Sequence, residues 1–415
     1  MKILWLSNKL LSQDDLRGTG TWLSSMAEGL LRSGEAELCN ISEGPVREMT
    51  RMNGGALTQW AVPASEVSGS SGLPTQKIAG QILDAIESFG PDLIHVWGTE
   101  GFWGLLTART AAGRTALLET QGLKFAIGRV FGGGLTFAEK LACIGVKELA
   151  RRSTIFDKER EYRRWGEYER EIIAGHRYIL VQTDWAESQV RAINPACIIH
   201  RSNCVLRGAF YRAQPWVYSG RPVLFCSASY SSPFKGIHVA VRAAAILKQT
   251  YPELELRIAG MHQRWGLRRD GYIAWVCREI ERLGLAQNTV WLGMLSADEI
   301  VQEMHNASAM LVPTYIENCC TAMQEAMLAG IPVIASYTGG LPSLAEDEKS
   351  ALFFPVGDHV MCARQCQRVI EDRELAEHLS RAGREVGCER NAPDAVLSNQ
   401  IEIYRSIIDD YHEEE

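Results

Sequence analysis

The stretch AMLVPTYIENCCTAMQEAMLAGIPVIAS, residues 309–336, joins two apolar runs through a segment with the composition of a buried helix. Each of the runs, AMLVPT and IPVIAS, has the length of a buried strand. When strand, helix and strand follow one another, the strands pair in parallel, because the crossover returns the chain to the same end of the sheet. The stretch therefore predicts one unit of a doubly wound α/β layer.

The same alternation of strand-like and helix-like segments extends through both halves of the chain. Apolar side chains recur at helical spacing in residues 22–31, for example, and a further helix is expected at residues 395–411. Two α/β series in tandem indicate a ligand held between two domains, at the carboxyl ends of their strands. Strands are predicted at residues 2–7, 92–98, 115–120, 178–183, 223–229, 254–260, 289–293, 309–314 and 331–336.

A chain of 415 residues is too long for one ordinary hydrophobic core, so we expect two domains. Residues 184–222 contain three prolines, several arginines and no clear period, which is typical of a linker. We expect an N-terminal Rossmann-like domain of residues 1–205, closed by the C-terminal helix 395–415. The C-terminal Rossmann-like domain is expected to comprise residues 206–394.

The bulk composition narrows the class of protein. A net charge of −7 disfavours a protein whose main partner is nucleic acid, and 46% hydrophobic residues are typical of a globular protein. The eleven cysteines are an odd number without a repeated CxxC pair, which favours free thiols in a reducing compartment. No run of 18 apolar residues occurs, so no membrane-spanning helix is expected. We expect a cytoplasmic protein.

Two glutamates in the opening stretch require an explanation, because buried carboxylates are rarely left without a partner. Glu317 lies near the predicted start of the helix and Glu325 lies inside it, so they meet either buried cations or a ligand. Between them the helix start offers backbone N–H groups at residues 318–321 without intrahelical partners, which is a ready site for an anion. This arrangement suits a ligand with hydroxyl groups at both ends and a diphosphate in the middle.

Two further segments lie directly after a predicted strand. Lys235 and Gly236 follow the first strand of the second series, so Lys235 is either a phosphate ligand or an ordinary solvated charge. Gly18 and Gly20 lie between the first strand and its helix, where they either let a ligand approach the backbone or only form a turn. The segment lacks the third glycine of GxGxxG, which disfavours a dinucleotide-binding dehydrogenase.

Several segments of the second half together resemble the nucleotide-sugar domain of glycosyltransferase family 4. These are retaining enzymes of the α/β GT-B fold, in which two Rossmann-like doubly wound domains face a central cleft. The Glu-x7-Glu spacing with EAMLAGIPVIAS is a specific signal. The first half is similar over RGTGTWLSSMAEGLLRSG, PDLIHVWGTEG and ALLETQGL. The other matching segments are PFKGIHVAVRAAAIL, LELRIAG, VWLGMLSADEI and TGGLPSLAEDEKSALFFPVGD.

The resemblance implies that the N-terminal domain is on the acceptor side, that the C-terminal domain binds the nucleotide sugar, and that each matching residue has a role. Glu317 would bind hydroxyls of the donor sugar and Glu325 those of the ribose, so neither is expected to be half of a salt bridge. A buried arginine partner is the alternative for Glu325. Lys235 would neutralise the diphosphate, and residues 318–321 would offer backbone donors. The implied catalytic residues are Lys235, Glu317 and Gln121. The implied donor-binding residues are Gly18, Gly20, Ser229, Lys235, Asn318, Cys319, Cys320, Thr321 and Glu325.

Two positions depart from the pattern of the family. Ser229 stands where an arginine usually precedes the lysine by six residues, and Gln121 with Gly122 stands where His-Gly is frequent. One cation for the diphosphate and a histidine near the reacting carbon are therefore missing. These departures keep open a non-catalytic member that binds a nucleotide sugar. A sugar-nucleotide epimerase of the same fold is a further alternative and would need acid–base residues near the sugar.

The implied function is retaining hexosyl transfer from a nucleoside diphosphate sugar to a glycan or lipid-linked glycan, as in surface polysaccharide synthesis. No metal and no cofactor are expected. Residues 123–175 are either a helical segment with a solvated, salt-bridged face or an insert that contacts the acceptor or the membrane. In the second case Phe125, Phe131 and Phe137 would enter the interface at the inner face of the membrane.

Overall fold

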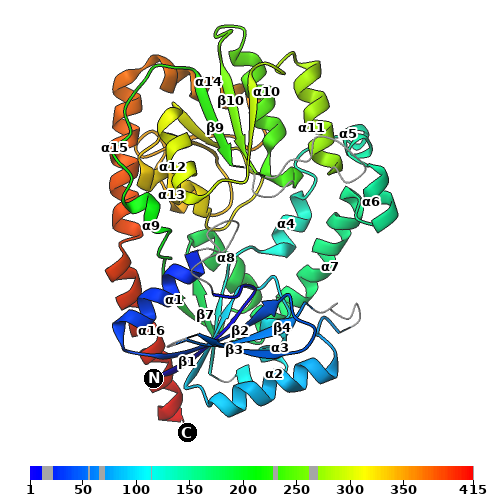
Figure 1. Cartoon of the computed structure of the whole chain (residues 1–415), viewed down its shortest axis with the longest axis vertical. Coiled ribbons are helices and arrows are strands. Elements are labelled where there is room, and N and C mark those ends of the chain that lie inside the picture. Colours follow the sequence, from blue (N-terminus) through cyan, green and yellow to red (C-terminus); the bar gives the residue numbers. More distant parts are fainter. Residues whose placement is uncertain are drawn as a thin grey trace.

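The computed structural model describes residues 1–11, 22–54, 57–64, 71–113, 115–227, 232–260 and 270–414. It contains two sheets, one in each lobe of the molecule (Figure 1). The strand order is β3-β4-β2-β1-β5-β6-β7-β8 in the first sheet and β11-β10-β9-β12-β13-β14 in the second. Within the described strands, only β3 and β4 pair antiparallel. The predicted pair of Rossmann-like doubly wound domains is confirmed.

Each predicted strand is present. The strands β1 and β11 have the predicted ends, and the ends of the others lie within two residues of the predicted ones. The first sheet also has strands that were not predicted, between residues 37 and 63 and at residues 198–201. Its strands are β1 (Lys2–Ser7), β2 (Glu37–Gly44), β3 (Thr50–Gly54), β4 (Leu57–Pro63), β5 (Leu93–Trp97), β6 (Ala116–Glu119), β7 (Tyr178–Val181) and β8 (Ile198–Arg201). The second sheet has β9 (Val223–Ser227), β10 (Glu255–Ala259), β11 (Thr289–Gly293), β12 (Ala309–Val312), β13 (Val333–Ser336) and β14 (Leu352–Phe354).

Helices cover both faces of each sheet, as parallel sheets require. No described helix is both long enough and apolar enough to cross a membrane. The first half contains α1 (Trp22–Ser33), α2 (Gln76–Phe89), α3 (Trp103–Ala108), α4 (Lys124–Val130), α5 (Phe137–Ala142), α6 (Val146–Arg151), α7 (Ile155–Ala174), α8 (Asp184–Ile193) and α9 (Gly208–Tyr211). The second half contains α10 (Ile237–Leu247), α11 (Gly271–Arg282), α12 (Ala297–Asn306), α13 (Thr321–Ala329), α14 (His359–Glu371), α15 (Arg373–Arg390) and α16 (Pro393–Glu414).

The segment predicted as a linker is only partly a linker. Residues 184–201 form α8 and β8, and β8 extends the first sheet by pairing with β7. Pro195 lies in the turn between these two elements, and Arg191 and Arg201 pair with Glu187 on the surface. The prediction failed because α8 has only two buried side chains, Ala186 and Val190, and β8 is an edge strand with no buried side chain, so neither element supplies an apolar run. The remaining connection, residues 202–222, contains α9.

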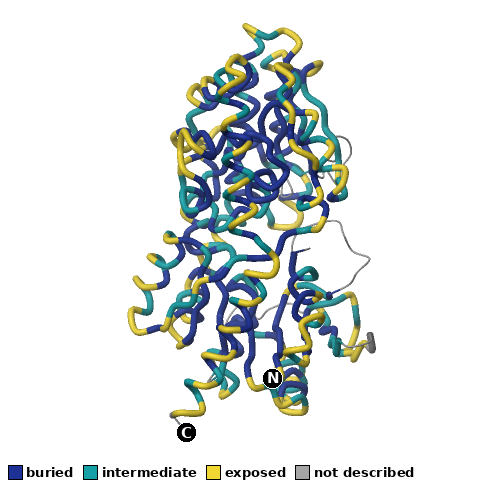
Figure 2. Tube along the Cα trace, turned by 90° about the vertical axis from the view of Figure 1, so that its left-hand side faces the viewer, coloured by how far each residue is buried: buried dark blue, intermediate teal, exposed yellow. Residues whose placement is uncertain are grey.

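The C-terminal helix returns to the first sheet. Trp5 Nε1 on β1 donates a hydrogen bond to the Tyr404 hydroxyl on α16 at 3.1 Å, and that hydroxyl lies 2.7 Å from His95 Nδ1 on β5. These three side chains are buried. Figure 2 shows buried segments of the chain inside this lobe. The helix thus belongs with the first sheet in space, and the proposed boundaries at residues 205 and 394 stay a prediction.

Helices α5 and α6 belong to the first half of the chain but pack on the second domain, beside α11 (Figure 1). Arg278 donates to the carbonyl of Ala142 at 2.6 Å, and Gly271 N–H donates to Glu148 Oε1 at 3.2 Å. The expectation that Phe125 and Phe131 enter a membrane is wrong, since they are 7% and 4% exposed. These two phenylalanines instead belong to the buried interior of the protein.

Candidate active site

A continuous cleft runs between the two domains. Its central cavity has a volume of about 730 Å³ and is lined by residues of both domains. Four residues, Lys235, Glu317, Cys319 and Thr321, also line a cavity of about 200 Å³ in the second domain. At the opposite end, a cavity of about 430 Å³ opens from the first domain. A ligand that spans both domains therefore fits in three adjoining compartments, and the size of the central one is usual for small-molecule sites.

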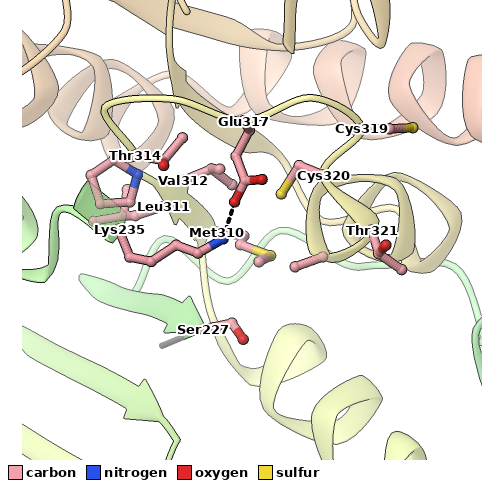
Figure 3. Close-up of a pocket in the computed structure, with 12 residues that line it drawn as sticks. Ser227, Lys235, Met310, Leu311, Val312, Thr314, Glu317, Cys319, Cys320 and Thr321 are labelled. Carbon is pink, nitrogen blue, oxygen red and sulfur yellow. Dashed lines mark hydrogen bonds and ion pairs between the residues drawn. The ribbon is translucent and has the colours of Figure 1, made fainter. Parts of the chain in front are cut away.

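The backbone around Lys235 fixes that residue beside the end of β12. Gly236 has φ +73°, and a Cβ there would lie 1.8 Å from the carbonyl oxygen of Pro313, so only glycine permits this approach. Figure 3 shows the Lys235 ammonium and the Glu317 carboxylate pointing toward each other, where they form an ion pair. The two side chains are 25% and 19% exposed, so the pair faces the cavity.

Glu317 is held by a second glycine loop. Gly340 N–H donates to the Glu317 carbonyl at 2.9 Å, and a Cβ on Gly339, which has φ +52°, would lie 2.0 Å from that carbonyl oxygen. The two glycines thus serve a close approach of one loop to another. Their effect on the site is to position the backbone of Glu317.

Helix α13 begins at Thr321, later than predicted, with Cys320 at its N-cap. No side chain caps this end, and Cys320, Thr321 and Ala322 line the small cavity that also contains Lys235. The first N–H groups of a helix lack intrahelical acceptors and carry a partial positive charge. An ammonium and a helix start in one compartment make it suitable for a phosphate group.

The side chain of Asn318 joins the two domains and is not among the residues that line the cavities described above, so the backbone role of Asn318 in donor binding stays a prediction. Its Nδ2 donates to the carbonyls of Thr120 and Gln121 at 3.2 and 2.7 Å, and its Oδ1 accepts from the Thr183 hydroxyl at 2.7 Å. The side chain is buried. Asn318 therefore helps to set the geometry of the cleft, because it holds the backbone of Gln121 against the loop that carries Glu317.

Replacing Asn318 with alanine is expected to lower the free energy of unfolding by about 1–3 kcal/mol, because it leaves buried polar partners unpaired. Urea denaturation would measure the loss. The matched control is Asn399→Ala, since Asn399 Nδ2 donates to the Arg201 carbonyl at the exposed surface, at 2.9 Å. An equal loss in both variants would contradict the role of the Asn318 contacts between domains.

The expectation that Glu325 has no cationic partner is wrong. The Arg207 guanidinium donates to both Glu325 carboxylate oxygens at 2.7 Å, and the two side chains are 12% and 6% exposed. Burial raises the pKa of Glu325, and Arg207 offsets part of this rise. Glu317 is also half of a salt bridge, with Lys235. Glu325 is not among the residues that line the cavities, so its contact with a ribose stays a prediction.

The structure brings together five of the predicted residues, Gln121, Lys235, Glu317, Cys319 and Thr321, around the central cavity. Cys320 joins Lys235 in the smaller one. Three predicted residues, Gly18, Gly20 and Ser229, lie outside the described residues. The residues of the central cavity that the sequence did not single out include Asn8, Trp97, Glu100 and Gln182. Lys124 and Tyr162 also line it and lie in residues 123–175, for which contact with the acceptor was one alternative. The segment GTEG, in the first-half resemblance, contained the only signal for Glu100.

Comparison with known proteins finds a family model that matches most of the second domain. Residues 210–386 match the family described as glycosyl transferases group 1. A D-inositol 3-phosphate glycosyltransferase from Salinispora arenicola is 27% identical over 183 residues, which are 43% of this chain and 40% of that protein. The enzyme of that name from Saccharomonospora viridis is 31% identical over 229 residues, 54% of this chain and 51% of that protein. The matched part thus spans about half or less of either relative.

Solved structures are similar over nearly the whole chain. A sucrose-phosphate synthase from Thermosynechococcus elongatus has a TM-score of 0.74 and 16% sequence identity, with 98% of both chains covered. The HepE protein from Anabaena, solved with UDP and glucose, has a TM-score of 0.65 and 14% identity, with 98% of this chain and 100% of that chain covered. Identities this low carry the fold alone, and that fold is GT-B.

Proposed function

Since residues 210–386 belong to the glycosyl transferases group 1 family and the chain has the GT-B fold, we propose that the protein is a retaining glycosyltransferase. It moves a hexosyl group from a nucleoside diphosphate sugar to a hydroxyl group of a glycan or a lipid-linked glycan. The reaction belongs to surface polysaccharide synthesis on the cytoplasmic side of the membrane. The observation that carries the proposal is the Lys235–Glu317 pair beside the start of α13, across one cavity from Gln121.

The donor site works by exchange of partners. With no donor bound, the Lys235 ammonium and the Glu317 carboxylate neutralise each other. A diphosphate in the small cavity attracts Lys235 and the N–H groups of α13, and Glu317 is then free to accept hydrogen bonds from sugar hydroxyls. As the glycosidic bond breaks, negative charge grows on the leaving phosphate, where these cationic groups stabilise it. The acceptor oxygen bonds to the anomeric carbon on the same face of the sugar, and the leaving phosphate oxygen takes the proton of that hydroxyl group.

The first experiment incubates the purified protein with UDP-, GDP- and ADP-sugars in the presence of EDTA, and measures binding and release of the nucleoside diphosphate. We expect one donor to be hydrolysed slowly without added metal, because Lys235 and α13 supply the positive charge at the phosphates. Inhibition by EDTA would overturn metal independence. Binding without release, even with glycan acceptors present, would favour a non-catalytic member, in which Gln121 replaces the usual histidine. Failure to bind any donor would contradict the proposed site.

We also propose that the protein contacts an anionic membrane through α5 and α6. The contact surface is a hydrophobic patch of four side chains. Phe137, Leu141, Val146 and Leu149 are 68%, 48%, 71% and 63% exposed. Four exposed apolar side chains between residues 137 and 149 exceed the scattered apolar side chains of an ordinary surface.

The charges around the hydrophobic patch support a lipid partner. Between residues 137 and 152 the chain has four basic side chains and two acidic ones. Both acidic side chains face the protein. Glu139 pairs with Arg242, and Glu148 is 7% exposed and accepts from backbone N–H groups. Arg151 and Arg152 are exposed beside the patch. An apolar face with a basic rim is the arrangement that binds anionic lipid interfaces.

Replacing Phe137 and Val146 together by serine is expected to reduce binding to anionic vesicles by about tenfold, because less apolar area enters the interface. Flotation with vesicles of phosphatidylcholine and phosphatidylglycerol would measure the bound fraction. Val217→Ser is the control, since Val217 is 74% exposed on the connection between the domains. Equal flotation of the double variant and the control, or none of the unmodified protein, would contradict the membrane contact.

A further inference from the structure

A row of polar side chains runs through the interior of the first domain, from α16 to the central cavity. It comprises Tyr404 on α16, His95 on β5, Glu119 on β6 and Gln182, which directly follows β7. The first three are at most 2% exposed, whereas Gln182 is partly exposed and lines the cavity. Buried polar groups are costly unless they bond with one another, so a role beyond packing is worth seeking for this row.

The contacts of the row lead step by step to the cavity. The Tyr404 hydroxyl, which accepts from Trp5 Nε1, lies 2.7 Å from His95 Nδ1. The other ring nitrogen of His95 lies 3.3 Å from Glu119 Oε2 and has no hydrogen-bond partner among the described residues. Glu119 Oε1 accepts from Gln182 Nε2 at 2.6 Å. The row thus ends in a short hydrogen bond that holds the amide of Gln182 from behind.

Glu119 is a largely uncharged partner for that amide. No lysine or arginine of the described residues forms an ion pair with it. Burial raises the pKa of Glu119 to about 8, although the hydrogen bond from Gln182 acts in the opposite direction. At neutral pH most molecules therefore keep the proton on this carboxyl group. An uncharged group fixes the amide without repelling a diphosphate that enters the cleft.

Gln182 lies where the first domain meets the loop that carries Glu317. The next residue, Thr183, donates to the side chain of Asn318, which follows Glu317, at 2.7 Å. Arg390 on α15 donates to the Gln182 carbonyl at 2.7 Å. Gln182 lines the central cavity together with Glu317, but it is not among the described residues that line the small cavity suited to phosphate. Gln182 therefore faces the part of a donor that lies beyond its phosphates.

The chemistry of the amide selects the group that it can bind. A glutamine side chain has two N–H donors and one carbonyl acceptor, and within the described part of the chain Glu119 takes one of the donors. The other N–H and the carbonyl can donate and accept at one place. A sugar hydroxyl also does both, whereas a phosphate only accepts and an apolar group would leave the amide without a partner.

We propose that Gln182 binds a hydroxyl group of the transferred sugar, and that Glu119 and His95 hold its amide in the orientation that does so. Gln182 would then contact this sugar from the first domain, while Glu317 contacts it from the second. Glu119 and His95 are positioning residues, since they act on the sugar only through Gln182. This role of Gln182 rests on the proposed transferase function, because it requires a nucleoside diphosphate sugar in the cleft.

The test compares each donor with the same nucleotide without its sugar. Isothermal titration calorimetry would measure Kd for UDP-glucose, GDP-mannose and ADP-glucose, and for UDP, GDP and ADP. In Gln182→Ala we expect Kd of the bound donor to rise about tenfold, the upper end for one uncharged hydrogen bond. Kd of the nucleoside diphosphate should change by less than about twofold, because its phosphates do not reach Gln182.

The matched control is Gln367→Ala, because the Gln367 amide also donates to a glutamate. Its Nε2 donates to Glu371 Oε1 at 3.0 Å on the exposed side of α14, outside the cleft. Both dissociation constants of this variant should stay within about twofold of the unmodified protein. The control therefore reports the effect of losing an amide–carboxylate pair that faces no ligand.

Two variants of Glu119 test the positioning. Glu119→Leu removes the acceptor behind Gln182, so Kd of the donor should rise as in Gln182→Ala, with no further rise in the double variant. Glu119→Gln keeps a carbonyl oxygen at that place, and its donor Kd should lie about fivefold or more below that of Gln182→Ala. This comparison decides the role of Glu119 even where Glu119→Leu does not fold.

The outcomes separate the role of Gln182 from the transferase function. If Gln182→Ala binds the donor as the control does, or loses donor and nucleoside diphosphate equally, Gln182 does not bind the sugar, while the transferase function stands. A loss that appears only in KM for an acceptor would overturn the assignment in the same way. Equal losses in Glu119→Gln and Gln182→Ala would overturn the positioning by Glu119. If the unmodified protein binds none of the three donors, the proposed function fails and the role of Gln182 with it.

Discussion

Replacing Lys235 with alanine is expected to lower the rate of glycosyl transfer by about 100- to 1,000-fold, the usual effect of removing one preorganised group that stabilises the leaving charge. The ammonium is held by the loop that Gly236 allows, beside the start of α13 and in contact with Glu317. Without it, the small cavity keeps the helix N–H groups but has no cationic side chain among the described residues that line it. The effect should appear in kcat more than in KM, because charge grows as the bond breaks. Initial rates with the donor identified by hydrolysis would measure it.

The control for this variant is Lys248→Ala. Lys248 lies at the end of α10 and donates to the Gly284 carbonyl at 2.6 Å, away from the residues that line the cleft. Its activity should stay within about twofold of the unmodified protein, as expected for a surface change of well under 1 kcal/mol. A Lys235→Ala protein that kept full kcat would contradict the role of Lys235, and another cation would have to stabilise the diphosphate.

Sequence reasoning succeeded where the signal is local. Buried parallel strands are short apolar runs, so the strands around the cleft could be predicted from residues 309–336 and their counterparts. Lys235 and Glu317 could be predicted because each lies between a strand and the helix that follows it, and parallel strands bring such connections to one edge of the sheet. The cleft residues of the first half were harder to find. Trp165 and Glu100 come from segments 65 residues apart, and no spacing pattern connects them.

Pairings between distant residues could not be predicted. Arg207 and Glu325 are 118 positions apart. The connection between the domains contains several arginines, and nothing in the sequence distinguishes which of them would pair with Glu325. Tyr404 and Trp5, which are 399 positions apart, illustrate the same limit. The reason is physical, because a side chain selects its partner only after the helices and strands have packed. The Glu-x7-Glu spacing identified the residues of the site but did not reveal that the second glutamate has a cation of its own.

Replacing Arg207 with alanine is expected to lower the free energy of unfolding by about 3–5 kcal/mol, because it leaves a buried carboxylate without its cation. Both guanidinium contacts to Glu325 are 2.7 Å, and the Glu325 side chain is 6% exposed. The guanidinium also packs on Phe210, with 4.9 Å to the ring centre. Urea denaturation at neutral pH would measure the loss. A change below about 1 kcal/mol, the size of an ordinary surface effect, would show that another group compensates the charge.

The pH dependence separates a lost charge pair from lost packing. Burial raises the folded-state pKa of Glu325 and Arg207 offsets part of the rise, so removal of Arg207 should raise this pKa further. A carboxyl group with a raised folded-state pKa destabilises the protein only as the pH rises above its unfolded value, about 4.3, toward and through the folded value. The stability difference between Arg207→Ala and the unmodified protein should therefore be larger at pH 8 than at pH 5. In Glu325→Leu with Arg207→Met, no buried charge remains, so most of the stability should return and the difference should lose its pH dependence. A difference that stays constant with pH in Arg207→Ala would assign the loss to packing against Phe210.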